Sequence, residues 1–284
     1  AWFRQPKLGL FLHWGLYAIE AWHEQDQWRR KWKREDYAKL ASRFTARNFD
    51  PNHWLDVAEE LGASYVCLTT KHADGFCLWD SDQTDYKVTN TPLGRDVVGE
   101  LAEACHRRGM PLFLYYSVVD EHHPAYPHAG RRWEYAGPQP GDKPSKKRYI
   151  DYLKAQVTEL CTRYGKIHGF WWDANIAKWH DPSVNAHIRK LQPGIVINNR
   201  GLDPGDYGTP GFGFSAPDRG LSGAGQPELG TAGGGRLLHR CPHPPLHCKN
   251  HGQGRALFAE HRTACRWPHS CRGSANAARR RAMV

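Results

Sequence analysis

The 284-residue chain has no run of about 18 consecutive apolar residues, so we expect no membrane span. It also lacks an initiator methionine and a basic segment followed by an apolar one, and we take the N-terminus to be trimmed or incomplete. Eight cysteines are present, but their spacing matches no disulfide framework. The sequence therefore leaves the cellular compartment open.

Two further absences narrow the function. No glycine-rich phosphate loop follows the first apolar run, which argues against a nucleotide-binding fold. The segment Asp120–His123 is rich in histidine but matches no standard set of metal ligands. We therefore predict no cofactor and no metal. A metal-dependent hydrolase stays as an alternative, which loss of activity on chelation and its recovery with zinc would favour.

Isoleucine and tyrosine are missing after Phe214, where glycine, proline, arginine, histidine and cysteine dominate. This segment holds ten Arg and one Lys against three acidic residues, so most of the net charge of +10 belongs to it. A segment so short of β-branched and aromatic residues cannot supply strands. We expect residues 211–284 to be a low-complexity basic tail that is disordered or translated out of frame.

The tail offers two alternative functions. Its cysteines and histidines are potential zinc ligands, but Cys241, Cys248, Cys265 and Cys271 are spaced more widely than in common zinc sites. Arg279–Arg281 has the charge to contact phosphate. An unstructured tail explains both features more simply, and we expect no nucleic-acid partner.

Aromatic residues are abundant, with Trp and Tyr counted twelve each. Exposed indole and phenol rings stack on the apolar faces of sugars, so this composition favours a carbohydrate ligand. An aromatic-rich core is the alternative, and composition alone does not separate the two.

Short apolar runs alternate with amphipathic stretches over the first two hundred residues. Five runs are typical of buried strands: Leu8–His13, Tyr65–Thr70, Pro111–Ser117, Gly169–Asp173 and Ile195–Asn199. Between them, four stretches are typical of helices: 51–61, 95–108, 149–164 and 182–191. This alternation predicts an α/β fold with a parallel sheet.

Polar residues sit at the C-terminal end of each predicted strand, among them His13, His72, Tyr116, Asp173 and Arg200. In a (β/α)₈ barrel, strand ends direct such side chains into one shared mouth, whereas in a doubly wound sheet they line a crevice. We favour a TIM-like (β/α)₈ barrel over residues 1–210. Because the tail cannot supply the remaining strands, we expect this barrel to be incomplete.

Three motifs carry the chemistry that this mouth offers. They are LFLHWGLY at Leu10–Tyr17, TKHADGFCLWD at Thr70–Asp80 and GFWWD at Gly169–Asp173. Together they supply two imidazoles, several indoles and one carboxylate at strand ends. Such a group of side chains suits a neutral polyhydroxylated ligand, because rings stack on its apolar face while polar groups bond its hydroxyls.

These motifs closely resemble glycoside hydrolase family 29, the α-L-fucosidases. WHEQ, FDPNHW, GRDVVGELAEACHRRG, LYYS, IRKLQP, VINNRG and GDYGTP follow in the family's order, and the resemblance covers about residues 1–210. It implies a retaining exo-glycosidase that hydrolyses α-L-fucosides through a covalent glycosyl-enzyme, with a fucosylated glycan or glycoconjugate as partner.

The resemblance also implies the roles of individual residues. Asp173 corresponds to the family nucleophile; by position alone it is more simply a helix cap. Four other residues match sugar-binding positions of the family, and a fifth, Glu24, matches its acidic hydroxyl-binding residue. The predicted substrate-binding residues are His13, Glu24, His72, Tyr116 and Trp171. For these five, a packed core side chain or a solvated loop acid is the alternative.

The chain departs from the family pattern at two positions and at its end. Ala73 stands where a second histidine is usual, and Gln25 where many relatives have tryptophan. The family's general acid/base lies beyond VINNRG, which here is the anomalous tail, and no motif identifies it. The alternative function is therefore an inactive remnant or a fucose-binding module that lacks this group.

Overall fold

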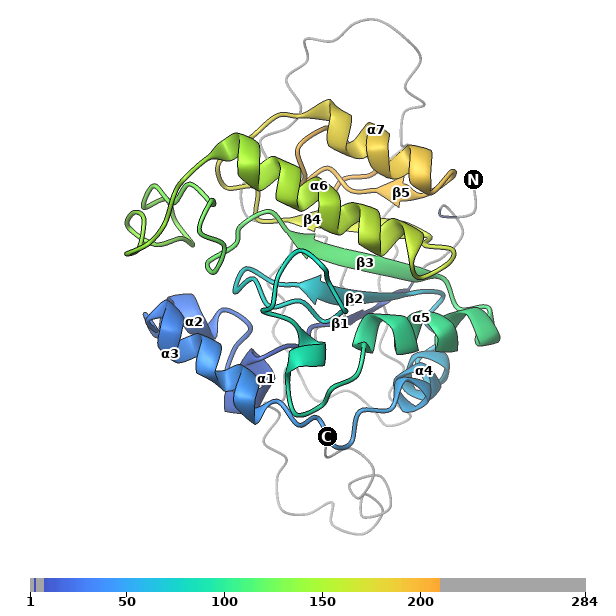
Figure 1. Ribbon diagram of the computed structural model, residues 1–284. Helices are drawn as coiled ribbons and strands as arrows, with labels where there is room; N and C mark the ends of the chain where they lie inside the picture. The colour runs from blue at the N-terminus through green and yellow to red at the C-terminus, as the bar shows by residue number, and fades with distance from the viewer. Residues whose placement is uncertain (1–2, 4–7, 210–284) are drawn as a thin grey trace, which may run out of the picture. The chain divides into compact units, whose positions relative to one another are not determined.

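Five parallel strands form the centre of the structure, a computed structural model that describes Phe3 and residues 8–209. The order of strands in the sheet is their order in the chain (Figure 1). The predicted tail, residues 211–284, lies outside the described residues. The strands are β1 (Leu10–Leu12), β2 (Val66–Lys71), β3 (Leu112–Ser117), β4 (Gly169–Asp173) and β5 (Val196–Ile197).

Helices alternate with the strands along the chain, as the sequence predicts. Parallel crossovers are right-handed, so a sheet whose strand order never reverses carries its helices on one face, whereas a doubly wound sheet reverses its order and carries helices on both. The observed order therefore selects the barrel arrangement. Within residues 8–209 no further strand pairs with β1 or β5, so the sheet stays open there. The helices between strands are α4 (Pro51–Glu60), α5 (Val97–Arg108), α6 (Lys146–Thr162) and α7 (Pro182–Leu191).

The four predicted helices are confirmed, and their ends follow local capping chemistry. The Asp50 side chain accepts from the Asn52 backbone N–H at 2.9 Å and begins α4. Helix α5 ends at Gly109, whose φ of 65° suits a glycine. Helix α6 begins three residues before the predicted start because the Ser145 side chain caps it. No helix in the described part of the chain could cross a membrane.

Three short helices between β1 and β2 were not predicted. They are α1 (Tyr17–Glu20), α2 (Asp26–Arg29) and α3 (Arg34–Ala38), and a 3₁₀ turn follows at Lys39–Arg43. Helices of four or five residues are too short to show a periodic pattern. Contacts with the long loop after β3 hold α2 and α3: Gln27 donates to Tyr135 at 2.6 Å, and Arg34 binds both carboxylate oxygens of Asp142.

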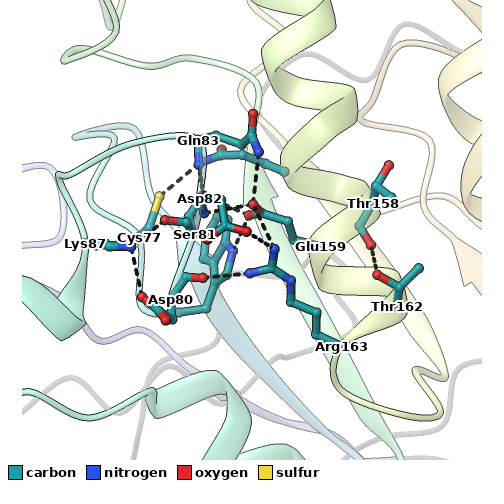
Figure 2. Close-up of polar contacts among 12 residues, drawn as sticks. Cys77, Asp80, Ser81, Asp82, Gln83, Lys87, Thr158, Glu159, Thr162 and Arg163 are labelled. Carbon is teal, nitrogen blue, oxygen red and sulfur yellow. Dashed lines mark hydrogen bonds and ion pairs between the residues drawn. The ribbon is translucent and has the colours of Figure 1, made fainter.

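A buried carboxylate on α6 holds the loop that follows β2 (Figure 2). One Glu159 oxygen accepts from the Trp79 indole at 2.9 Å and from the Ser81 hydroxyl at 2.8 Å. The other accepts from the Asp82 backbone N–H at 2.8 Å and the Gln83 amide at 3.1 Å. The Arg163 guanidinium also donates to the second oxygen at 3.5 Å, so five donors depend on one side chain.

Replacing Glu159 is expected to destabilise the fold strongly. Glu159→Ala leaves these donors without their acceptor and should lower the free energy of unfolding by about 3–5 kcal/mol in denaturant titrations. Glu159→Gln keeps one acceptor oxygen and should cost less. Glu103→Ala, at a side chain that is 72% exposed, is the control and should change stability by less than about 0.5 kcal/mol. Equal losses at the two positions would contradict this assignment.

Candidate active site

The two faces of the sheet carry different clusters. One face packs against the helices in the main core. We call the other the inner face, and it carries a separate aromatic cluster of Tyr65, Cys67, Phe113, Tyr115 and Trp171. Strand side chains alternate between faces, so each strand contributes every second residue to this cluster. At the carboxyl ends of the strands, polar side chains continue the inner face.

Asp173 is the carboxylate at this end of β4, two residues after Trp171. Its Oδ2 accepts from the Tyr115 hydroxyl at 2.9 Å. Its Oδ1 accepts from the Arg200 guanidinium, at 2.9 Å from Nε and also from a terminal nitrogen. The Asp173 side chain is 24% exposed, so it remains accessible to a ligand. A helix cap would accept from the second or third residue after it, whereas the side-chain contacts of Asp173 join it to Tyr115 and Arg200 on other strands and loops.

These contacts keep Asp173 ionised. Burial by itself would raise the pKa of the carboxyl, but the Arg200 guanidinium and the Tyr115 hydroxyl outweigh it and lower the pKa below its ordinary value. Burial raises the pKa of Tyr115, which therefore remains a hydrogen-bond donor. The site holds a carboxylate anion at neutral pH.

Two imidazoles lie beside this carboxylate. The His72 ring stacks on Tyr115, with centroids 5.7 Å apart and planes at 10°. The His13 ring lies 5.8 Å from His72 and 5.5 Å from Tyr115. Burial, and next the His13 imidazole, lower the pKa of His72 to about 4. At neutral pH His72 is therefore uncharged, and a neutral imidazole can donate one hydrogen bond and accept another.

Glu24 approaches the same group from the segment between α1 and α2. Its Oε2 lies 3.1 Å from Nδ1 of His23, and its side chain is 32% exposed. Its charge acts on His72, where it opposes the lowering of the imidazole pKa. The structure thus brings the Glu24 charge near the His72 imidazole.

Trp171 forms part of the aromatic floor beneath these groups. Its ring lies 5.3 Å from Phe11 and 5.9 Å from Tyr207, and the residue is 6% exposed. It shares the inner face with Asp173, because both follow the same alternation along β4.

Tyr116 lies elsewhere, and its predicted place in the sugar pocket is wrong. It pairs in register with Trp172 and faces the helices, fully buried. Its hydroxyl donates to Gln156 of α6 at 2.6 Å. The preceding residue, Tyr115, pairs with Trp171 and contacts Asp173 instead. Paired residues of parallel strands share a face, so register decides between two adjacent tyrosines of identical chemistry.

Arg200 contacts the candidate nucleophile, and the sequence does not predict this contact. The residue follows the fifth predicted strand, but nothing in the sequence pairs it with Asp173. The sequence does show a cation, Arg200, after the fifth predicted strand and an acid, Asp173, at the end of the fourth. In a sheet whose order follows the chain, those two ends are adjacent.

The two residues that depart from the family pattern, Ala73 and Gln25, each accept a hydrogen bond. The Ala73 carbonyl accepts from the Glu121 backbone N–H at 2.8 Å, which joins the loops after β2 and β3. The Gln25 side chain accepts from Arg29 at 2.9 Å. Neither hydrogen bond replaces the imidazole that relatives usually have at position 73 or the indole that many have at position 25.

The histidine-rich segment after β3 takes part in packing. The His122 ring stacks on Tyr86 at 3.9 Å, and the His123 ring lies 4.0 Å from Tyr152. Within the described residues, no group of three or more His, Cys, Asp or Glu side chains is arranged to hold a metal ion.

Comparison with known proteins defines the class of this site. The family model for alpha-L-fucosidase matches residues 1–228. Human tissue alpha-L-fucosidase is 36% identical over 143 residues, covering 44% of this chain and 31% of the relative. The alpha-L-fucosidase of Dictyostelium discoideum is 30% identical over 234 residues, covering 70% of this chain and 48% of the relative.

Solved structures agree. Alpha-L-fucosidase isoenzyme 1 from Paenibacillus thiaminolyticus has a TM-score of 0.68 at 37% identity, covering 74% of this chain and 54% of that one. Alpha-L-fucosidase AlfC from Lactobacillus casei, in complex with α-L-fucose, has a TM-score of 0.67 at 30% identity, covering 76% and 75%. The fold is thus part of a glycosidase barrel, and the chain belongs to the alpha-L-fucosidase family. It spans about a third to a half of the length of the two curated relatives.

Proposed function

We propose that this protein hydrolyses α-L-fucosides as a retaining exo-glycosidase, with Asp173 as the nucleophile. The observation that carries the proposal is an accessible carboxylate, held by Arg200 and Tyr115, on the same face as the imidazoles of His13 and His72. A fucosylated glycan or glycoconjugate is the proposed substrate.

The first chemical step follows from this geometry. A carboxylate oxygen of Asp173 forms a bond to the anomeric carbon, the bond from that carbon to the leaving oxygen breaks, and the leaving oxygen takes up a proton from a general acid or from water. Arg200 and Tyr115 keep the nucleophile ionised and fix its orientation before attack. Water then hydrolyses the glycosyl-enzyme and returns the carboxylate.

Sugar hydroxyls are the proposed ligands of His13, His72 and Glu24. A sugar hydroxyl both donates and accepts, which matches a neutral imidazole beside a carboxylate. Trp171 offers an apolar surface to the sugar at the inner face. Because His72 is uncharged well above its pKa of about 4, its contribution to binding should not change between pH 6 and 8.

Binding without turnover is the second candidate. A retaining glycosidase needs a second carboxyl group roughly 5–5.5 Å from the first to protonate the leaving oxygen. The sheet that would present it is open in the described residues, because no strand there follows β5. A fucose-binding module with the same pocket fits this observation.

One pair of measurements on the same sample separates these candidates. Calorimetric titration with α-L-fucose should give saturable binding, and p-nitrophenyl α-L-fucoside should release p-nitrophenolate over repeated turnovers, because hydrolysis of the glycosyl-enzyme needs the second carboxyl group as a base. The β-L-fucoside is the control and should release none. Binding without release would favour the fucose-binding module. Neither binding nor release would contradict both candidates.

A further inference from the structure

His72 owes its position to an irregularity in β2. Thr69 pairs with Tyr115 of β3, but Lys71, two residues later, pairs with Tyr116, so the register shifts by one residue at Thr70. Strict alternation from Thr69 would put Lys71 on the inner face and His72 on the helix side. The shift reverses both, so Lys71 faces the helices and His72 faces Tyr115. Bulges of this kind redirect side chains beside active sites.

Two hydrogen bonds hold Thr70, the bulged residue: its hydroxyl donates in one, and its carbonyl accepts in the other. The Thr70 hydroxyl donates to the Tyr115 carbonyl at 2.6 Å, a bond that is buried. The Thr70 carbonyl accepts from the Leu78 backbone N–H at 2.9 Å. These bonds satisfy the polar groups that the interrupted ladder leaves without strand partners.

A buried ion pair holds Lys71 on the helix side of the sheet. Its Nζ lies 2.7 Å from Asp120 Oδ2 and 3.3 Å from the Tyr149 hydroxyl, and neither charged side chain is more than 1% exposed. The ammonium also lies 4.4 Å from the centre of the Tyr116 ring. Moving Lys71 to the inner face would leave the Asp120 charge buried and unpaired, which is strongly unfavourable.

Asp120 is itself fixed by the loop after β3. Its Oδ1 accepts from the backbone N–H groups of His122 and His123 at 3.0 and 2.8 Å. Burial would raise the pKa of Asp120, but the Lys71 ammonium lowers it below its ordinary value. The acceptor of the ion pair therefore remains charged and stationary.

We propose that Lys71 is a positioning residue: its buried ion pair with Asp120 fixes the bulge at Thr70 and thereby holds the His72 imidazole on the inner face beside His13. The inference rests on the proposed function for the role of His72 in sugar binding, but the placement of the imidazole is testable without it. The groups that face His72 there are His13, Glu24, Asp173 and His23, together with the Tyr17 ring.

The test uses the full chain with the pair removed as a unit. Lys71→Met alone leaves Asp120 unpaired and is expected to unfold readily, whereas Lys71→Met with Asp120→Asn removes both charges. In the double variant, the imidazole of His72 should leave its buried position. Its pKa, followed by NMR and assigned from its loss in His72→Ala, should rise from about 4 toward the ordinary value of about 6.5.

Fucose binding supplies the second readout. The double variant should bind α-L-fucose at least about tenfold more weakly, and adding His72→Ala to it should cause no further loss, because coupled residues are not additive. Lys147→Met with Asp151→Asn removes an exposed ion pair of the same kind, 2.8 Å long, and should change neither readout.

Two results would overturn the inference. One is a folded double variant that keeps the His72 pKa near 4 and the wild-type fucose affinity. If the double variant does not fold, Thr70→Val decides, because it removes the hydroxyl anchor of the bulge and keeps both charges. A rise of the His72 pKa toward about 6.5 in Thr70→Val is the other, because the intact ion pair would then not hold the imidazole in place. Failure of the wild-type chain to bind fucose would instead contradict the proposed function and leave the His72 titration valid.

Discussion

Asp173→Ala should abolish turnover of p-nitrophenyl α-L-fucoside, with kcat lower by on the order of 10⁴-fold or more, as expected when a covalent nucleophile is removed. The carboxylate that attacks the anomeric carbon is gone, while the groups proposed to bind the sugar remain. Fucose binding should therefore persist in this variant. Asp151→Ala, at a side chain that is 58% exposed, should keep the wild-type rate.

Azide provides an independent check on the same residue. The space left by the Asp173 side chain admits a small anion, which can attack the anomeric carbon of an activated fucoside in place of the carboxylate. Asp173→Ala with azide should release p-nitrophenolate and form β-L-fucosyl azide, with the azide on the face that Asp173 occupied. A wild-type rate for Asp173→Ala without azide would refute the nucleophile assignment.

Arg200→Met is expected to have the next largest effect. The variant loses two charge-assisted hydrogen bonds to Asp173. A hydrogen bond to a charged group contributes about 1.5–3 kcal/mol, which corresponds to a loss of roughly 10- to 100-fold in kcat/KM at neutral pH. Arg200→Lys keeps the charge but not the fork of two donors, and should fall between Met and wild type.

The pH dependence of this variant has a definite direction. In the wild type the pKa of Asp173 lies below its ordinary value of about 3.9, so the ionised group stabilises the fold above that pH. This contribution is lost as the pH falls through the lowered pKa. Without Arg200, burial raises the pKa, and the acidic limb of the kcat/KM profile should move to higher pH.

A pH–rate profile measured from pH 3 to 8 tests this expectation. Arg107→Met, at a guanidinium whose side chain is 54% exposed, is the control and should keep the wild-type profile. An acidic limb at the same pH in Arg200→Met and in wild type would show that Arg200 does not set the protonation of Asp173.

Most of the fold was predictable from local patterns. The five predicted strands and four predicted helices are present, because apolar periodicity and capping residues such as Asp50, Ser145 and Gly109 act over a few neighbouring residues. Asp173, His13 and His72 also lie at strand ends, as the sequence predicts, since each ends or follows an apolar run. The family motifs, in order, add the proposed chemistry.

Three features of the site were not predictable. The exchange of Tyr116 for Tyr115, the contact of Arg200 with Asp173 and the bulge at Thr70 all depend on which residue of one strand lies opposite which residue of the next. The short helices α2 and α3 depend on contacts with a loop about a hundred residues away in the chain, such as Gln27 with Tyr135.

The amino-acid sequence thus determined the kinds of element, their order and the side chains available at the strand ends. Only the tertiary structure decided the face on which each side chain lies. The physical reason is the two-residue period of a strand, because a register shift of one residue exchanges the two faces. Here the shift is held by the ion pair of Lys71 with Asp120, which lies far away in the chain. The secondary-structure propensities of the residues around Thr70 do not predict that shift.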